Sequence, residues 1–197
     1  MSTLKSREPE ATVDPLFINR WSPRAYTGEE IPVAVLLSVF EAARWAPSAR
    51  NAQPWRFVYA KRQSAAFDRL VATMADDNQK WAPNASALIA LLSAKTYIVD
   101  DKTETNIHRS FDAGAAWSNL SLQANMLGWQ TRAIGKFDRA QAAAVLRAPS
   151  LYAIEVIIAI GKIGNPETLP VDLRKLEVPT KRAPLRELFS EGTYSAP

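Results

Sequence analysis

The run Tyr152–Ile160 constrains the fold of this chain more than any other stretch of its sequence. It is β-branched and nearly all apolar, which is typical of a strand. Ala87–Ser93 is a second continuous apolar run. It is typical of a strand covered on both faces, although periodicity alone leaves a buried helix open. Arg56–Ala60 also has the composition of a strand. The chain therefore contains at least one sheet.

Apolar residues at helical spacing lie between these runs. Val33 and Phe40 belong to a helix that is predicted to reach about Trp45 and to begin near Pro32. Thr27–Glu30, just before it, has the spacing of a capping box. Further helices are expected over 64–75, 109–127, 141–146 and 185–189. Because strands and helices alternate without a regular βαβ rhythm, we predict an α+β sandwich, a mixed central sheet flanked by helices.

The size and composition of the chain limit its possible functions. A chain of 197 residues is expected to form one domain, over 15–197, after a flexible N-terminus over 1–14. The lack of cysteine excludes disulfides, zinc–thiolate sites and thiol catalysis. A single histidine, His108, argues against metal clusters and against a Ser-His-Asp triad, so no metal site is expected. Residues 1–14 do not resemble a signal peptide and no apolar run reaches the ~20 residues of a membrane span, so we expect a cytoplasmic protein without a membrane partner.

The charge pattern favours a small anionic ligand. Lysine and arginine exceed aspartate and glutamate by four, but they are spread along the chain rather than clustered in a nucleic-acid-binding tail. The sequence has no Gly-x-Gly-x-x-Gly motif for a dinucleotide and no Gly-Lys-Ser/Thr loop for a nucleoside triphosphate. We expect no nucleic-acid partner.

The link between the first helix and the first strand is dense in hydrogen-bonding groups. Pro47 ends the helical conformation, and polar side chains follow at Ser48, Asn51 and Gln53. A loop of this composition between two regular elements suits a flat polar ring. The alternative is an ordinary helix-to-strand connection.

Two arginines and a serine alternate on an extended segment near the N-terminus. Arg20, Ser22 and Arg24 would share one face there and could bind a phosphate, because arginine binds phosphate through two parallel hydrogen bonds. The alternative is a solvated basic strand that is kinked at Pro23. Arg182, from the C-terminal end, could complete the pocket.

Two segments allow more than one interpretation. The helix expected over 109–127 is rich in small residues, among them Ala113, Gly114 and Ala116, which suits either a buried central helix or contact with a partner subunit; we favour the partner. Residues 96–108 are polar and charged and are predicted to form a surface loop or lid.

At this point the sequence resembles the FMN-dependent nitroreductase family, from about residue 15 to residue 190. Four features carry the resemblance in the expected order: Arg20-x-Ser22-x-Arg24, the segment Ala46–Trp55, Gly135 after a turn at Gly128, and Arg182. The pattern Pro-Ser-x-x-Asn-x-Gln-Pro-Trp within Ala46–Trp55 is the most specific of these features.

The resemblance implies an α+β fold and an obligate homodimer with two FMN sites at the subunit interface, each built from both chains. The phosphate and ribityl side of FMN, or the nearby edge of the ring, would be held by Arg20, Ser22, Arg24 and Arg182. The flavin would be reached from the partner subunit by Pro47, Ser48, Asn51 and Gln53. The ring would lie against Ile134 and Gly135.

The resemblance also implies a ping-pong oxidoreductase. NADH or NADPH would reduce the flavin and leave, and a nitroaromatic, a quinone or a similar small acceptor would then take the electrons at the same site. No side chain need act as a nucleophile, so no catalytic residue is predicted. Gln130 stands where many members have a small residue, and Ile134 where some have an acidic one, which puts the acceptor and the choice of donor in question. The alternatives are a specialised flavin enzyme of the same fold, acting in dehalogenation or in enone or aldehyde reduction, and a non-enzymatic flavin-storage protein.

Overall fold

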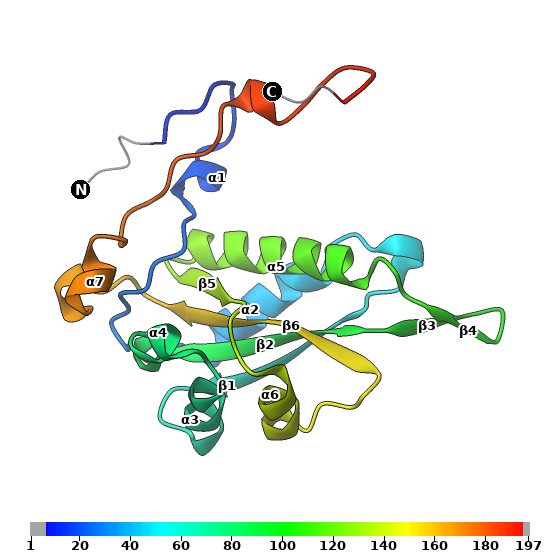
Figure 1. Ribbon diagram of the computed structural model, residues 1–197, viewed down its shortest axis with the longest axis horizontal. Coiled ribbons are helices and arrows are strands. Elements are labelled where there is room, and N and C mark those ends of the chain that lie inside the picture. Colours follow the sequence, from blue (N-terminus) through cyan, green and yellow to red (C-terminus); the bar gives the residue numbers. More distant parts are fainter. Residues whose placement is uncertain (1–6, 195–197) are drawn as a thin grey trace.

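A four-stranded sheet forms the centre of the computed structural model, which describes residues 7–194 (Figure 1). The strand order is β1-β2-β6-β5, and each neighbouring pair is antiparallel. The strands are β1 (Trp55–Lys61), β2 (Ala87–Ala94), β5 (Gln130–Ile134) and β6 (Tyr152–Gly161). The α+β class is confirmed, and within residues 7–194 the predicted mixed pairing is replaced by a purely antiparallel one.

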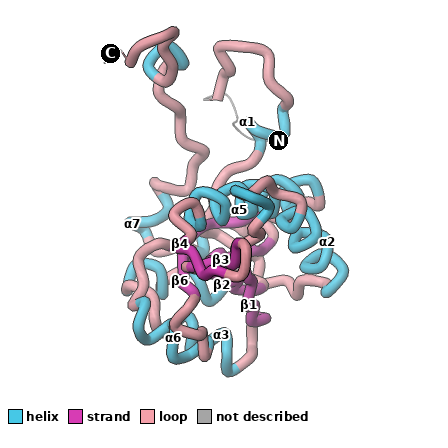
Figure 2. The backbone as a smooth tube through the Cα atoms, turned by 90° about the vertical axis from the view of Figure 1, so that its right-hand side faces the viewer, coloured by secondary structure: helices cyan, strands magenta, loops and turns pink. Residues whose placement is uncertain are grey.

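Helices cover both faces of this sheet (Figures 1 and 2). One face carries α2 (Val33–Arg44) and α5 (Arg109–Met126), and the other carries α3 (Ala65–Ala72) and α6 (Arg139–Leu146). The central strand β2 is buried on both sides, because Leu88 packs toward α3 and α6 while Ile89 packs toward α2 and α5. Of the two interpretations of this apolar run, the strand is therefore confirmed.

The small residues of α5 pack against the chain's own core. Ala113, Ala116 and Ala124 are buried between α2 and the sheet, where small side chains let the helix approach closely. The side that faces away from the sheet differs, since Phe111 is 81% exposed and a Cβ at Gly114 would meet open space. The burial thus matches the central-helix interpretation, and only the outer side remains available to a partner.

Residues 96–108 are not the predicted loop. β3 (Thr96–Val99) and β4 (Lys102–Thr105) form an antiparallel hairpin that projects beyond the main sheet (Figure 1). Asp100 and Asp101 make its two-residue turn, with φ of 47° and 60°, as tight hairpins require. The hairpin carries little apolar patterning because β4 is exposed along its whole length, which explains why its sequence resembles a loop.

Two local predictions about helix boundaries were wrong. Thr27–Glu30 is not a capping box: α2 begins only at Val33, with Pro32 as its N-cap, and Thr27 Oγ1 accepts a hydrogen bond from the backbone of Glu29.

The remaining short helices are α1 (Pro15–Asn19), α4 (Asp76–Gln79) and α7 (Val171–Arg174), with 3-10 turns at Ala49–Asn51, Ala82–Asn84, Pro166–Thr168 and Leu185–Glu187. The predicted helix over 185–189 is therefore a single 3-10 turn.

The two ends of the chain run away from the sheet together. We call residues 7–20 the N-terminal arm and residues 176–190 the C-terminal arm (Figure 1). Arg7 Nε donates to the carbonyl of Thr180 at 3.0 Å, and the Leu185 amide donates to Glu10 at 3.1 Å. Of the predicted flexible segment 1–14, residues 1–6 lie outside the described part. Within residues 7–194, no helix combines the length and hydrophobicity that crossing a bilayer requires.

Candidate functional site

Arg20 and Ser22, which were predicted to share a face, do lie together. Arg20 follows α1 in an extended conformation, and its Nη1 donates to Ser22 Oγ at 3.3 Å. Asp14 caps the N-terminus of α1 through the Leu16 amide at 2.8 Å, and Arg20 ends the helix, its amide donating to the Leu16 carbonyl at 3.2 Å. The local sequence thus directs both side chains to the same side of the chain.

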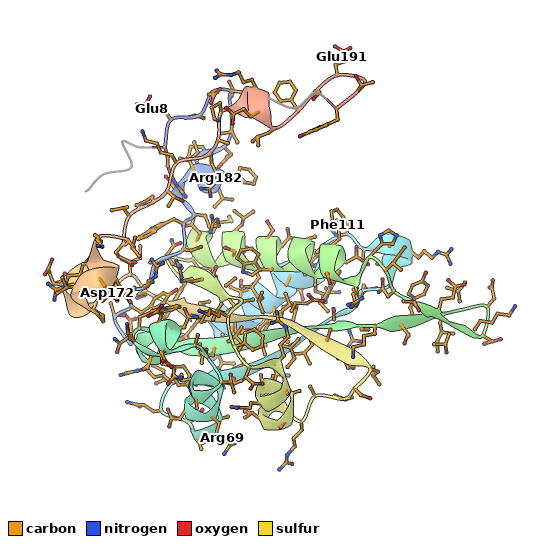
Figure 3. All side chains as sticks on the ribbon, in the orientation of Figure 1. Glu8, Arg69, Phe111, Asp172, Arg182 and Glu191 are labelled. Atoms are coloured by element: carbon orange, nitrogen blue, oxygen red, sulfur yellow. The ribbon has the colours of Figure 1, made fainter. Side chains whose placement is uncertain are left out.

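Arg182, on the C-terminal arm, lies near enough to Arg20 for its charge to act on the Arg20 guanidinium. Burial lowers the pKa of Arg20, and the positive charge of Arg182 lowers it further. Arg7, which sequence analysis missed, belongs to the same group: burial lowers its pKa first, followed by Arg182 and then Arg20. Figure 3 shows Arg182 on the C-terminal arm, above the body of the sheet. We call Arg7, Arg20, Ser22 and Arg182 the arginine cluster.

The guanidinium groups of this cluster form no ion pair within the described part of the chain. Like charges at close range repel one another and favour an anion between them. Guanidinium groups beside a hydroxyl are the donor set that suits a phosphate, so the residues present fit the phosphate end of FMN.

Arg24 is placed differently from Arg20. Its Nη1 donates to the carbonyl of Leu176 at 3.3 Å and lies 3.8 Å from the Glu177 carboxylate. Arg24 is therefore already paired with an acid of the C-terminal arm, whereas Arg20 is not. The structure brings Arg20, Ser22 and Arg182 together and directs Arg24 to the base of that group.

Arg132 is a second arginine that sequence analysis missed. It lies on β5, and its Nη1 donates to the carbonyl of Ser22. Its guanidinium lies 5.7 Å from the ring centre of Trp81. Burial lowers its pKa, and the charge of Arg24 adds to that effect. One signal was available in the sequence, namely a single arginine inside a short strand.

The loop over 47–53 is held in an unusual conformation. Arg50, Asn51 and Gln53 have φ of 51°, 53° and 44°, in the left-handed region that side chains other than glycine disfavour. Ser48 Oγ accepts from the Gln53 amide at 3.0 Å, and buried Asp112 of α5 accepts from the Ala49 amide at 3.2 Å. Backbone strain of this kind persists only where its surroundings enforce it, and it concentrates at functional sites.

This loop keeps polar groups turned to the exterior. Asn51 and Gln53 are exposed, and Gln53 Nε2 donates to the Asn51 carbonyl at 3.2 Å. Pro47 ends the turn that follows α2, as its restricted backbone predicted, since the Ala46 amide still donates to Ala43. Hydrogen bonds thus hold this loop in a defined conformation.

The residues predicted to lie against the ring divide into two kinds. Gly135 is exposed at the end of β5, and a Cβ there would meet nothing within 4 Å, so its backbone is open to a ligand. The side chain of Ile134 is instead buried, 2% exposed, in the core on the α3 and α6 face. Gln130 is also buried and donates to Asn125 at 2.6 Å. Gln130 and Ile134 are the two positions at which this chain departs from the family pattern, and both side chains thus lie in the protein interior.

The helix α5 lies between the two halves of the predicted site. The loop over 47–53 is bound to Asp112 in the first turn of α5, whereas Ser22 is bound to Arg132 on β5, which follows the last turn. A helix of 18 residues is about 27 Å long. The chain therefore does not bring the loop and the arginine cluster together around one ligand.

Comparisons with known proteins bear directly on this arrangement. A profile of the nitroreductase family matches residues 18–162. The chain belongs to the nitroreductase family. A solved structure described as an oxidoreductase containing FMN is 40% identical, with a TM-score of 0.95 and complete coverage of both chains. YfhC of Bacillus subtilis, named as an NAD(P)H nitroreductase, is 29% identical over 88% of this chain and 90% of its own.

A third relative shows the cofactor in place. The structure of a nitroreductase from Desulfovibrio desulfuricans, described as a complex with FMN, is 26% identical with a TM-score of 0.72 and covers 93% of this chain and 100% of its own. An NADH dehydrogenase of Thermus thermophilus is 28% identical over 73% of this chain and 83% of its own. The resemblance seen in the sequence is thereby confirmed at the level of family and enzyme class.

Proposed function

We propose that two copies of this chain form a homodimeric, FMN-dependent oxidoreductase that passes electrons from NADH or NADPH to a nitroaromatic, a quinone or a similar small acceptor. The arginine cluster carries this proposal, because Arg7 and Arg182 both donate to the Thr180 carbonyl, Arg7 also donates to the Arg20 carbonyl, and within residues 7–194 none of the three guanidiniums forms an ion pair. Such a group needs an anion, and the phosphate of FMN supplies one. The relatives described as containing or binding FMN support the choice of anion.

The homodimer follows from the separation of the two half-sites. Within one chain α5 lies between the strained loop over 47–53 and the arginine cluster. A second copy would bring its own loop to the flavin that the first copy holds by the phosphate. The exposed side of α5, with Phe111 and Gly114, is an unpartnered surface that the second copy would cover.

Residues of both chains would then divide the binding of FMN. Arg20, Ser22 and Arg182 would hold the phosphate, with Arg24 behind them, and the open backbone at Gly135 would approach the ring. The amide side chains of Asn51 and Gln53 on the second copy's loop would donate to the polar edge of the flavin. When bound, FMN accepts a hydride from a nicotinamide and delivers electrons to the acceptor.

We further propose that donor and acceptor use the same space in turn. The chain has no dinucleotide motif of its own, which fits a donor that stacks on the flavin and departs before the acceptor enters. The protein's part is to orient the ring, to place donors near its developing negative charge and to limit access of water. No side chain is required as a nucleophile.

The visible absorption spectrum of the purified protein tests the proposal. We expect an FMN spectrum that bleaches when NADH or NADPH is added without oxygen and returns when a quinone is added. Sedimentation should show a dimer with two FMN per dimer. A flavin that stays oxidised with both donors would indicate storage instead. A protein that binds no FMN after incubation would refute the proposed site.

A further inference from the structure

Glu177, on the C-terminal arm, is a buried acid that lies next to the arginine cluster but outside it. Its side chain is 1% exposed. Its Oε1 accepts from the backbone amides of Arg24 at 2.7 Å and of Ala25 at 2.8 Å. Its Oε2 is buried, has no hydrogen-bond partner among the described residues 7–194, and lies 3.8 Å from the Arg24 guanidinium. One carboxylate thus joins the C-terminal arm to the segment that carries Arg20 and Ser22.

Arg132 holds the same segment from another element. It donates from β5 to the carbonyl of Ser22, while Glu177 accepts from the two amides that follow Pro23. The backbone from Ser22 to Ala25 is therefore fixed by a half-buried cation and a buried anion. Burying charged groups contributes little to stability because the desolvation cost is high, but it imposes a definite geometry.

The position of Glu177 matters because the positively charged guanidinium groups of the arginine cluster repel one another. Arg182 follows Glu177 by five residues on the same arm, and its charge acts on Arg20 and Arg7. Something must hold the arm against this repulsion when no anion is present. Glu177 can do so without neutralising the cluster, because its carboxylate contacts the Arg24 backbone rather than Arg20 or Arg182.

We infer that Glu177 is a positioning residue for the FMN phosphate: it fixes the C-terminal arm against Arg24 and Ala25 and thereby sets the directions of Ser22, Arg20 and Arg182. This inference rests on the proposed function. Glu177 touches no ligand in this arrangement. It preorganises the groups that do, as supporting residues around a binding site are expected to do.

The inference predicts an effect confined to the phosphate. Glu177→Gln keeps the shape of the side chain and removes its charge, so that the arm is held less firmly. We expect its affinity for FMN to fall about tenfold, the scale of one charged hydrogen bond. Its affinity for riboflavin, which lacks the phosphate, should stay within about threefold of the wild-type value. A general structural defect would weaken the binding of both ligands equally.

The matched control is Glu167→Gln. Glu167 forms an ion pair with Arg174 at 2.7 Å, but it is exposed, and within residues 7–194 no hydrogen bond or ion pair joins it to the segment over 20–25. We expect it to bind FMN and riboflavin as the wild type does. Both ligands would be titrated by quenching of flavin fluorescence, into protein from which FMN has been removed.

The outcomes separate this inference from the proposed function. Wild-type protein that does not prefer FMN to riboflavin would refute the proposed phosphate site itself. If the wild type prefers FMN to riboflavin and Glu177→Gln keeps the same preference, only the role of Glu177 is refuted. If Glu177→Gln does not fold, hydrogen exchange on FMN-free wild-type protein replaces it. Slow exchange of the Arg24 and Ala25 amides is expected there, and fast exchange would overturn the inference.

Discussion

At the residue scale, the proposed site depends on charges that the sequence places at its two ends. Arg7 and Arg20 come from one end of the chain and Arg182 from the other, and they meet only because the two arms run together. The first prediction concerns Arg20, because it is the member of the cluster that touches Ser22.

We expect Arg20→Ala to lose about 1.5–3 kcal/mol of FMN binding free energy, the scale of a hydrogen bond between charged groups. Titration of the FMN-free protein measures the loss. Arg69→Ala is the control, because Arg69 lies exposed on α3, far from the arms (Figure 3). Equal FMN affinity of Arg20→Ala and wild type would remove Arg20 from the site.

Tyr26 carries a second prediction at this scale. Its hydroxyl is buried and has no hydrogen-bond partner within residues 7–194, and burial raises its pKa above the usual value of about 10. The unfolded chain therefore loses this proton first, so this group's contribution to stability is complete below about pH 10 and is lost as the pH rises above that value.

Tyr26→Phe removes both the orphan hydroxyl and its ionisation. We expect the free energy of unfolding at pH 7 to change by less than about 1 kcal/mol, because no hydrogen bond is lost. Above pH 10 the variant should lose less stability than the wild type. Urea unfolding at pH 7 and pH 10.5 measures both quantities. A large loss at pH 7 would show that the hydroxyl has a partner after all.

The residues that sequence analysis missed share a physical reason. Glu177 binds the backbone of Arg24, 153 positions away, and Arg132 binds Ser22 across 110 positions. Such pairs leave no local pattern. Arg20 and Ser22 were found because alternation on an extended segment is visible within five residues, and Asn51 because its loop is dense in turn-forming groups.

At the element scale, the predictable parts of the fold are those with a buried face. β2, β6, α2 and α5 were predicted because burial imposes apolar runs or helical spacing on their sequences. The β3–β4 hairpin was missed because an exposed strand needs no such pattern. The role of α5 could be decided only once its small residues were placed against the sheet.

The packing of α5 gives a prediction at this scale. Ala116→Leu adds volume at a fully buried position between α2 and the sheet, so we expect a loss of about 1–3 kcal/mol in stability. Thermal unfolding would show this as a drop of roughly 2–4 °C in Tm for each kcal/mol. Ala140→Leu, exposed on α6, should cost less than about 0.5 kcal/mol. Similar Tm values for the two variants would contradict the close approach of α5.

At the scale of the whole molecule, the proposed function requires each chain to supply two half-sites that belong to different flavin sites. The strained loop over 47–53 is bound to Asp112 in the first turn of α5, and the arginine cluster lies at the paired arms. A flavin held by both would couple cofactor binding to dimerisation. FMN binding should therefore be lost when the dimer is lost, even if every residue of the arginine cluster is intact.

Gly114→Arg tests this coupling. A side chain at Gly114 meets open space within its own chain, and replacing a helical glycine favours the helix by up to ~1 kcal/mol, so the fold should persist. In the proposed dimer the new side chain would stand in the subunit interface beside Phe111, which is 81% exposed in the single chain. We expect sedimentation to show a monomer that has lost FMN while its Tm stays at or above that of an FMN-free wild type. Ala140→Arg, which adds the same charge on α6 across the sheet, should remain a dimer with FMN bound. A Gly114→Arg dimer that retains FMN would place the interface elsewhere, and a monomer that retains FMN would mean that one chain suffices for the cofactor.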